Sequence, residues 1–174
     1  TDTGGSIRIP SSACGLVGIK GTFGRVSRHG VMPLSYSLDN AGPMTRTVRD
    51  CARMFKIIAG QDKFDSTASL DEVPDYEFLI ENFNFKGKKI GIPSSYFYEN
   101  VEDSIWTALQ SSLDLYRHLG AQIVTVDIPD QIILRDLTNL IFKSEAANIH
   151  KNWMINSPKQ YQSEVLARIE AGLY

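Results

Sequence analysis

Glycine is concentrated near one end of this chain, and this distribution constrains the fold more than any other feature of the sequence. Eight of the 13 glycines lie within the first 42 of the 174 residues. Because glycine permits positive φ angles and a close approach of two backbone segments, we expect backbone geometry to govern that part of the chain. The pattern of the remaining residues predicts regular secondary structure, with turn residues near the ends of the elements.

Hydrophobic periodicity and turn residues predict the elements that follow residue 47. The predicted helices span residues 48–59, 76–81, 102–119, 136–155 and 162–171, and the predicted strands span residues 88–92 and 121–127. Thr47 and Asp50 resemble a capping box at the start of the first of these helices. Strands that alternate with helices favour a parallel or mixed sheet covered by helices. The predicted fold is therefore α/β, with a mixed, largely parallel sheet flanked by helices.

The composition is that of a globular protein and argues against several functional classes. Hydrophobic residues make up 43% and charged residues 22% of the chain, which argues against disorder. The formal net charge is −2 and no basic run occurs, so we expect no nucleic-acid contact. The sequence lacks the stretch of about 18 apolar residues that predicts a membrane span. With only two cysteines, Cys14 and Cys51, the simplest expectation is a reduced, cytoplasmic protein.

Two glycines followed by a serine form a turn that has the composition of an acyl-transfer site. The order Thr3-Gly4-Gly5-Ser6 lets consecutive backbone N–H groups point into one concavity, which binds an anion or a developing oxyanion. The Ser6 hydroxyl then lies beside those donors, where a serine nucleophile has to be. On spacing alone, however, the same residues also describe an ordinary flexible turn.

Charged residues flank this turn on both sides. Asp2 and Arg8 carry opposite charges around Ser6, so that they can clamp the two ends of the loop. Ile7 and Ile9 alternate with polar residues, and we expect them to anchor the loop in apolar surroundings. This pattern differs from that of a flexible linker and favours a structured site.

A serine nucleophile needs a base, and the sequence does not identify one. The candidates within the chain are Lys20, His29, Asp39, His118 and His150. We interpret His29 as part of a solvent-facing turn, His118 as a cation that suits the last turn of a helix, and His150 as part of an amphipathic helix surface. No pair of these residues has a metal-site or triad spacing that the sequence alone establishes, and we expect no metal and no organic cofactor.

Two other side chains have both a chemical and a structural interpretation. A thiol nucleophile at Cys14 has no evident partner, and we favour a small buried core residue there. Glu145 on its predicted helix offers an acid or a base, but a hydrogen-bonded or surface carboxylate is the preferred interpretation.

Several runs within the first 60 residues resemble the amidase signature family. TDTGGSIRIP at residues 1–10 and CGLVGIK at residues 14–20 are similar to the second half of the amidase signature. GRVS at residues 24–27 and SLDNAGPMTRTV at residues 37–48 continue the resemblance, which covers most of this segment. The sequence departs from the family pattern at Gly21, where the family often has proline after the lysine.

The resemblance implies hydrolysis of a carboxamide C–N bond by a Ser–cis-Ser–Lys triad. Ser6 matches the serine nucleophile that forms the acyl intermediate. The backbone N–H groups around Thr3, Gly4, Gly5 and Ser6 match the oxyanion hole. In the family, the lysine and the bridging serine both precede this loop, so we expect them upstream and do not assign their roles to Lys20.

The same resemblance assigns Asp2 and Arg8 to positions that brace the loop. It also implies that residues 1–174 form a single incomplete domain, an interior piece of a larger amidase domain with the amidase-signature fold. Because the base and the bridging serine are expected outside this piece, we predict that the 174-residue fragment alone is inactive.

Two further functions stay open beside hydrolysis of a small-molecule amide. One is the A subunit of a tRNA-dependent amidotransferase, which shares the signature and delivers ammonia within an assembly of partner subunits. The other is a non-catalytic module whose Gly-Gly-Ser nest only binds an anion or another ligand. A homo-oligomer also stays open, whereas we expect neither direct nucleic-acid binding nor membrane association.

Overall fold

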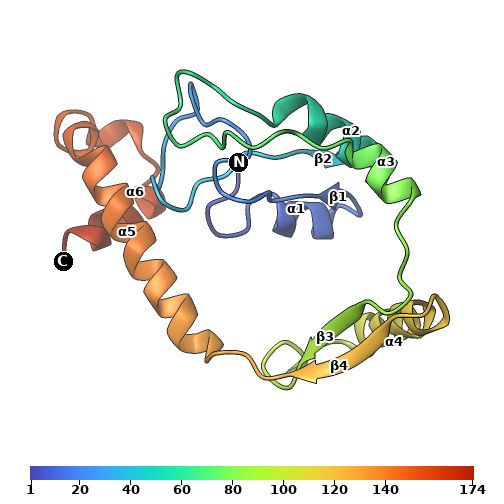
Figure 1. The fold of residues 1–174 in the computed structure, drawn as a ribbon. Coiled ribbons are helices and arrows are strands. Elements are labelled where there is room, and N and C mark those ends of the chain that lie inside the picture. The colour runs from blue at the N-terminus through green and yellow to red at the C-terminus, as the bar shows by residue number, and fades with distance from the viewer. The chain divides into compact units, whose positions relative to one another are not determined.

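A computed structural model describes residues 1–174 and contains both helices and small sheets (Figure 1), which confirms the predicted α/β class. The strands form two two-stranded sheets, one antiparallel and one parallel. Contacts between Cα atoms divide the chain into two compact units: unit 1 comprises Thr1–Glu81 and Leu137–Tyr174, and unit 2 comprises Asn82–Asp136. The prediction that both units belong to one incomplete domain stays a prediction.

The glycine-rich segment of unit 1 contains a short helix that the sequence analysis did not predict. Helix α1 spans Arg8–Ala13 and directly follows the glycine turn. Pro10 is tolerated because it lies in the first turn, where a backbone N–H has no helical partner. Strand β1, Val17–Gly18, pairs in antiparallel fashion with β2, Met44–Thr45. Residues 19–43 therefore form one long loop between the two strands.

Helices α2, Val48–Ile58, and α3, Tyr76–Glu81, confirm their predicted positions. Thr47 Oγ1 accepts a hydrogen bond from the N–H of Asp50 at 3.1 Å, which caps α2 as expected. The buried face of α2 consists of Cys51, Ala52 and Phe55. Exposed ion pairs join α2 to the α3 segment at Arg49–Glu81, Arg53–Glu77 and Lys56–Asp75. Because exposed pairs contribute little, burial of the apolar face is what holds α2 in place.

The other part of unit 1 consists of α5, Gln131–Asn156, whose first residues belong to unit 2, and α6, Ser163–Glu170. Short 3₁₀ turns follow them at Pro158–Gln160 and Ala171–Leu173. The core here is formed by Ala146, Ala147, Met154 and Ile169, and Leu34 of the long loop packs against it. Helix α5 begins at Gln131 rather than at residue 136 because Asp130 accepts a hydrogen bond from the N–H of Ile132 at 2.8 Å and caps the helix.

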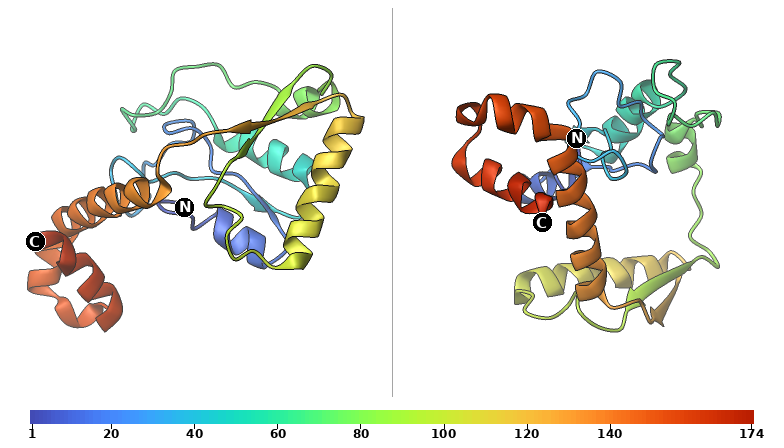
Figure 2. Two further views of the ribbon diagram at one scale, coloured as in Figure 1. Left: turned by 90° about the horizontal axis from the view of Figure 1, so that it is seen from below. Right: turned by 90° about the vertical axis from the view of Figure 1, so that its left-hand side faces the viewer.

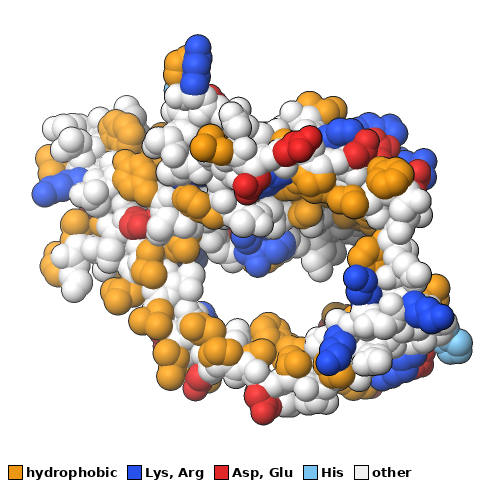
Figure 3. All heavy atoms as spheres, in the orientation of Figure 1, with side chains coloured by type: hydrophobic (Ala, Val, Ile, Leu, Met, Phe, Trp, Pro, Cys, Tyr) orange, Lys and Arg blue, Asp and Glu red, His pale blue; other side chains and the backbone are white.

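Several hydrophobic side chains of α5 are exposed. Leu137, Leu140 and Ile141 are between 44% and 64% exposed, and Figure 3 shows hydrophobic side chains along this helix. None of the helices is both long and apolar enough to cross a membrane.

Two interpretations of single residues in unit 1 are wrong. His150 is buried instead of lying on the surface: its Nδ1 lies 2.8 Å from Oη of Tyr161, and its ring contacts that of Trp153. Tyr161 lies in the turn after α5. The helical periodicity of α5 alone does not predict where this turn lies relative to the helix. Conversely, Cys14 is exposed because it follows the end of α1 and does not face the core.

Unit 2 is a strand–helix–strand unit, as the sequence predicts. Strand β3, Lys89–Pro93, pairs in parallel with β4, Gln122–Val126, along the whole length of both. Helix α4, Asp103–His118, connects the two strands (Figure 2). His118 is exposed in the last turn of α4, where it was expected.

Candidate active site

The glycine turn is folded around the carboxylate of Asp2. This side chain is fully buried and accepts hydrogen bonds from the N–H groups of Gly5 at 2.7 Å and Ile7 at 3.2 Å. The main chain of Asp2 also pairs with that of Asn40 through two hydrogen bonds of 2.8 and 2.9 Å. The turn therefore has a defined shape and is tied to the end of the long loop.

Arg8 closes onto the same carboxylate from the other side. Its Nε and Nη2 atoms each lie 3.0 Å from one oxygen of Asp2, which makes the ion pair bidentate. Burial alone raises the pKa of Asp2, but the hydrogen bonds from Arg8, Ile7 and Gly5 and the charge of Arg8 outweigh it. The pKa of Asp2 therefore lies well below its usual value, and the hydrogen bond to Asp2 raises the pKa of Arg8.

A second buried carboxylate, Asp39, holds the turn at Thr3. Thr3 Oγ1 donates to Asp39 Oδ1 at 2.5 Å, while Oδ2 accepts from the N–H groups of Leu34 at 2.8 Å and Ser35 at 3.0 Å. Asp39 is only 5% exposed. These bonds make Asp39, one of the candidate bases, an anchor of the turn.

Close packing leaves no room for a side chain at two glycines in and near the turn. Gly5 has a φ of +135°, and a Cβ there would lie 2.6 Å from Cδ1 of Ile9. Gly18 on β1 lies so close to α1 that a Cβ would collide with Oγ of Ser11. At these two positions, the glycine is required because the backbone must adopt a left-handed conformation or approach a neighbouring segment.

Ser6 lies at a cavity of about 250 Å³ that could hold an acyl group. The turn contributes Thr3, Gly4 and Ser6 to its wall, and Ser6 itself is exposed. The other lining residues are all uncharged: Ile9, Leu34, Thr138, Asn139 and Phe142. The cavity volume is several times the volume of about 30 Å³ that a water molecule takes up in the liquid, so there is room for a carbonyl group.

The hydrogen bonds of the turn decide which N–H groups remain for a ligand. The N–H of Gly5 is bonded to Asp2, and Gly5 does not line the cavity. The N–H groups of Thr3, Gly4 and Ser6 take no part in the hydrogen bonds within the chain. The N–H of Gly5, one of the expected oxyanion donors, is thus already bonded within the turn, and the positive φ of Gly5 shapes the turn. Which of these N–H groups bind an oxyanion stays a prediction.

Helix α5 supplies a wall of the cavity that sequence reasoning missed. Thr138, Asn139 and Phe142 lie on successive turns of this helix and line the same space as Ser6. The helix itself was expected, but its apolar residues occur on several faces, so that no periodic signal singles out the face at the cavity. By contrast, the candidate bases Lys20, His29, His118 and His150 do not line the cavity.

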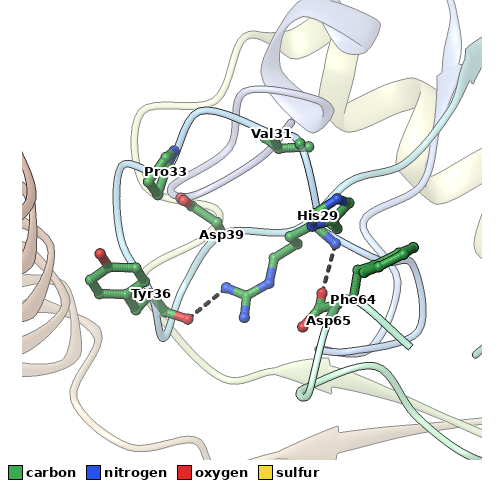
Figure 4. Close-up of a pocket in the computed structure, with 9 residues that line it drawn as sticks. His29, Val31, Pro33, Tyr36, Asp39, Phe64 and Asp65 are labelled. Carbon is green, nitrogen blue, oxygen red and sulfur yellow. Dashed lines mark hydrogen bonds between the residues drawn. The ribbon is translucent and has the colours of Figure 1, made fainter. Parts of the chain in front are cut away.

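A second cavity, of about 280 Å³, contains His29 (Figure 4). The His29 ring stacks on Phe64 with 5.0 Å between the ring centroids, and the residue is exposed as expected. Figure 4 also places Asp39 at this cavity. Ser6 is not among the residues that line this cavity.

Glu145 binds α5 to the long loop. Its Oε2 accepts from Ser35 Oγ and from the N–H of Ser37 at 3.1 Å, and its Oε1 accepts from Ser37 Oγ at 2.8 Å. Burial raises the pKa of Glu145, but hydrogen bonds from Ser35, Ser37 and the main chain at Tyr36 outweigh it and lower that pKa below its usual value. Glu145 is therefore the hydrogen-bonded carboxylate that the sequence analysis favours.

Known proteins are similar in sequence to most of this chain. A family model described as Amidase matches residues 1–173. The chain is 42% identical over 147 residues to the A subunit of the glutamyl-tRNA(Gln) amidotransferase of Roseiflexus sp. (strain RS-1), and the alignment covers 84% of this chain and 30% of that relative.

Solved structures are similar over nearly the whole chain. The A subunit of the glutamyl-tRNA(Gln) amidotransferase from Thermotoga maritima matches with a TM-score of 0.80 and 35% identity, over 99% of this chain and 36% of that one. A structure described as an unexpected vestigial protein complex that reveals the evolutionary origins of an s-triazine catabolic enzyme matches with a TM-score of 0.87 and 29% identity, over the same shares of the two chains. This chain thus spans about a third of the length of these relatives. Because the family model matches almost every residue and the fold agrees, the chain belongs to the amidase signature family.

Proposed function

We propose that this chain carries the nucleophile of an enzyme that hydrolyses carboxamides through an acyl-Ser6 intermediate. The observation that carries the proposal is the position of Ser6, which lines an uncharged cavity from a turn held by two buried carboxylates, Asp2 and Asp39. Membership of the amidase signature family supports the same activity.

In the proposed reaction, Ser6 Oγ attacks the carbonyl carbon of the amide, and the carbonyl oxygen becomes an oxyanion. We assign the N–H groups of Thr3, Gly4 and Ser6 to this oxyanion, because the N–H of Gly5 is bonded to Asp2. A single donor of this kind contributes about 2.7–4 kcal/mol to the transition state. The C–N bond then breaks, ammonia or an amine leaves with a proton, and water releases the acyl group and restores the Ser6 hydroxyl.

The base that accepts the Ser6 proton is not among the residues that line the cavity. We do not assign this role to Lys20, since it does not line the cavity and its Nζ donates to the carbonyl oxygen of Gly21 at 3.0 Å. We keep the assignment that the family resemblance implies, a lysine acting through a second serine, both upstream of the turn. In this proposal Asp2 and Arg8 brace the turn and do not touch the substrate.

The relatives favour a more specific candidate, the A subunit of a tRNA-dependent amidotransferase. The relatives from Roseiflexus and Thermotoga both carry the name of such an amidotransferase component. In this candidate function, the ammonia released at Ser6 is delivered to an acceptor on partner subunits. Co-purification with partner subunits that are required for amide transfer supports this candidate, whereas a homo-oligomer with full hydrolytic activity supports a free-standing amidase.

We also propose that the enzyme acts in the cytoplasm on a small-molecule amide. Cys14 and Cys51 are both free thiols, which fits a reducing compartment. A cavity of about 250 Å³ fits the acyl part of a small substrate.

The test compares Ser6→Ala with Ser12→Ala in the complete protein that contains these residues. Ser12 is an exposed serine of α1 that does not line the cavity, so it is a matched control. Ammonia release is measured with L-glutamine and with a set of aliphatic and aryl amides. Ser6→Ala is expected to lower kcat by several orders of magnitude, and Ser12→Ala to leave it unchanged. Turnover of the Ser6→Ala protein near that of the unchanged protein would instead support the non-catalytic module.

A further inference from the structure

We propose that Glu145 is a positioning residue of the acyl-transfer site, which sets the oxyanion turn and the α5 wall of the cavity in one arrangement. Glu145 does not line the cavity, so it acts only through other residues. The inference rests on the proposed function, because it assigns a role in the reaction at Ser6.

The first step is the attachment of Glu145 to the long loop. Both carboxylate oxygens are used: one accepts from Ser35 Oγ and from the N–H of Ser37, and the other accepts from Ser37 Oγ. Ser35 is fully buried, so water cannot replace the carboxylate as the partner of its hydroxyl. Ser35 and Glu145 are 110 positions apart in the sequence, so this is a long-range contact between the loop and α5.

The second step leads from the loop to the oxyanion turn. The N–H of Ser35 donates to Asp39 Oδ2 at 3.0 Å, and the N–H of Asp39 returns a bond of 3.0 Å to the carbonyl of Ser35. The other oxygen of Asp39 accepts from Thr3 Oγ1 at 2.5 Å. A continuous set of hydrogen bonds therefore runs from Glu145 through Ser35 and Asp39 to Thr3, whose N–H is one of the assigned oxyanion donors.

The third step concerns the cavity wall. Phe142 and Thr138 precede Glu145 by three and seven residues, so all three project from the same side of α5. Leu34 lines the cavity as well, donates its N–H to Asp39, and packs against Ala146 and its neighbours in the core. A displacement of Glu145 would consequently move the wall at Phe142 and the turn at Thr3 relative to each other.

A carboxylate is needed at this position because every group that contacts it is a donor. A Glu145→Gln substitution keeps the size but replaces one acceptor oxygen by an NH₂ group. The NH₂ group should take the side of Ser37 Oγ, whose hydroxyl can rotate and accept from it, so that the oxygen keeps the bonds from Ser35 Oγ and from the N–H of Ser37. These two bonds become weaker, because a hydrogen bond to an ionised acceptor is about twice as strong as one between neutral groups. The substitution therefore loosens the contact between the loop and α5 while leaving the cavity lining unchanged.

The experiment is a double-mutant cycle in the complete protein, with the amide that it hydrolyses fastest. The variants are Glu145→Gln, Thr3→Val and their combination, where Thr3→Val keeps the side-chain shape and removes the hydroxyl that binds Asp39. Glu145→Gln is expected to lower kcat by about 10- to 100-fold and to change KM by less than about threefold. The kcat of the combined variant should be only slightly lower than that of the less active single variant, because both substitutions break the same hydrogen-bond network. Glu164→Gln, on an exposed position of α6, is the matched control and should leave kcat unchanged.

The cycle distinguishes the possible failures. An unchanged kcat in Glu145→Gln, or losses that multiply independently in the combined variant, would overturn the role of Glu145. If these results come with an inactive Ser6→Ala protein, the proposed function stands and only this inference fails; if Ser6→Ala retains turnover, both fail. Should Glu145→Gln not fold, Ser37→Ala removes one of the three donors and is expected to give a smaller loss of kcat with the same non-additivity toward Thr3→Val; independent losses there would overturn the inference too.

Discussion

The buried carboxylate of Asp2 offers the most direct test of how the turn is built. Its Oδ1 accepts from the N–H of Gly5 and from Nη2 of Arg8, while its Oδ2 accepts from the N–H groups of Ile7 and Arg8 and from Nε of Arg8. An Asp2→Asn substitution keeps the shape but replaces one oxygen by an NH₂ group that cannot accept. The nitrogen should take the side with fewer donors, where it opposes Gly5 and Nη2 of Arg8.

The loss of stability follows from those two bonds. A hydrogen bond to a charged group contributes about 1.5–3 kcal/mol, and the buried N–H of Gly5 has no water to replace Asp2. The Arg8 side chain is 53% exposed, so water compensates for most of its loss, and we assign it at most about 1 kcal/mol. Asp2→Asn should therefore lower the local stability of the turn by about 1.5–4 kcal/mol.

Hydrogen exchange of the Gly5 amide, followed by mass spectrometry on the complete protein, measures this local stability. Since each 1.4 kcal/mol is a factor of ten, exchange should become about 10- to 700-fold faster in Asp2→Asn. Glu81→Gln, which removes one partner of an exposed ion pair with Arg49, serves as the control and should leave the rate at Gly5 unchanged. An acceleration at Gly5 of less than about threefold would refute the reasoning, because the lost hydrogen bond would then contribute almost nothing.

Three further predictions concern the same site. The folded-state pKa of Asp2 lies below its ordinary value of 3.8, so its contribution to the turn is complete above that pH and is lost as the pH falls below it; Gly5 exchange should show this loss in acid, and Asp2→Asn should not. Phe142→Ala should enlarge the cavity and shift the ratio of kcat/KM values toward bulkier acyl groups by about tenfold, and an unchanged ratio would remove Phe142 from the substrate site. Residues 1–174 alone should resist labelling of Ser6 by a fluorophosphonate that labels the complete protein, whereas equally rapid labelling would show that the fragment already contains its base.

The elements after residue 47 were predictable because their signals are local. Helix α2 has a capping residue, a periodic apolar face and a glycine after its end, and all three lie within 14 residues of sequence. Helix α1 has none of these signals, since it is six residues long and contains Pro10. It forms because Ile7 is fully buried beneath it and because the turn before it is held by Asp2, and neither fact can be read from periodicity.

The part of the candidate site that is local in sequence was predictable, and the part that depends on long-range contacts was not. Ser6, Asp2 and Arg8 lie within seven residues of one another, and their order alone suggested a clamped turn around a serine. The contact of Thr3 with Asp39 spans 36 residues, and the contribution of α5 to the cavity depends on a helix more than 130 residues away in sequence. Such contacts are set by packing of the whole unit, so no spacing rule reveals them.

The two buried carboxylates have separable tasks. The carboxylate of Asp2 bonds only to groups within six residues of itself, so it fixes the shape of the turn. The carboxylate of Asp39 links the turn to the loop that Glu145 attaches to α5, and so fixes its placement. Shape and placement give different signals, because exchange of the Gly5 amide depends on its bond to Asp2 and kcat depends on both. Asp2→Asn should consequently accelerate exchange and lower kcat, while Glu145→Gln should lower kcat and leave exchange at Gly5 as it is. If Glu145→Gln accelerates exchange at Gly5 as strongly as Asp2→Asn does, the turn and the loop form one cooperative unit and this division of tasks is wrong.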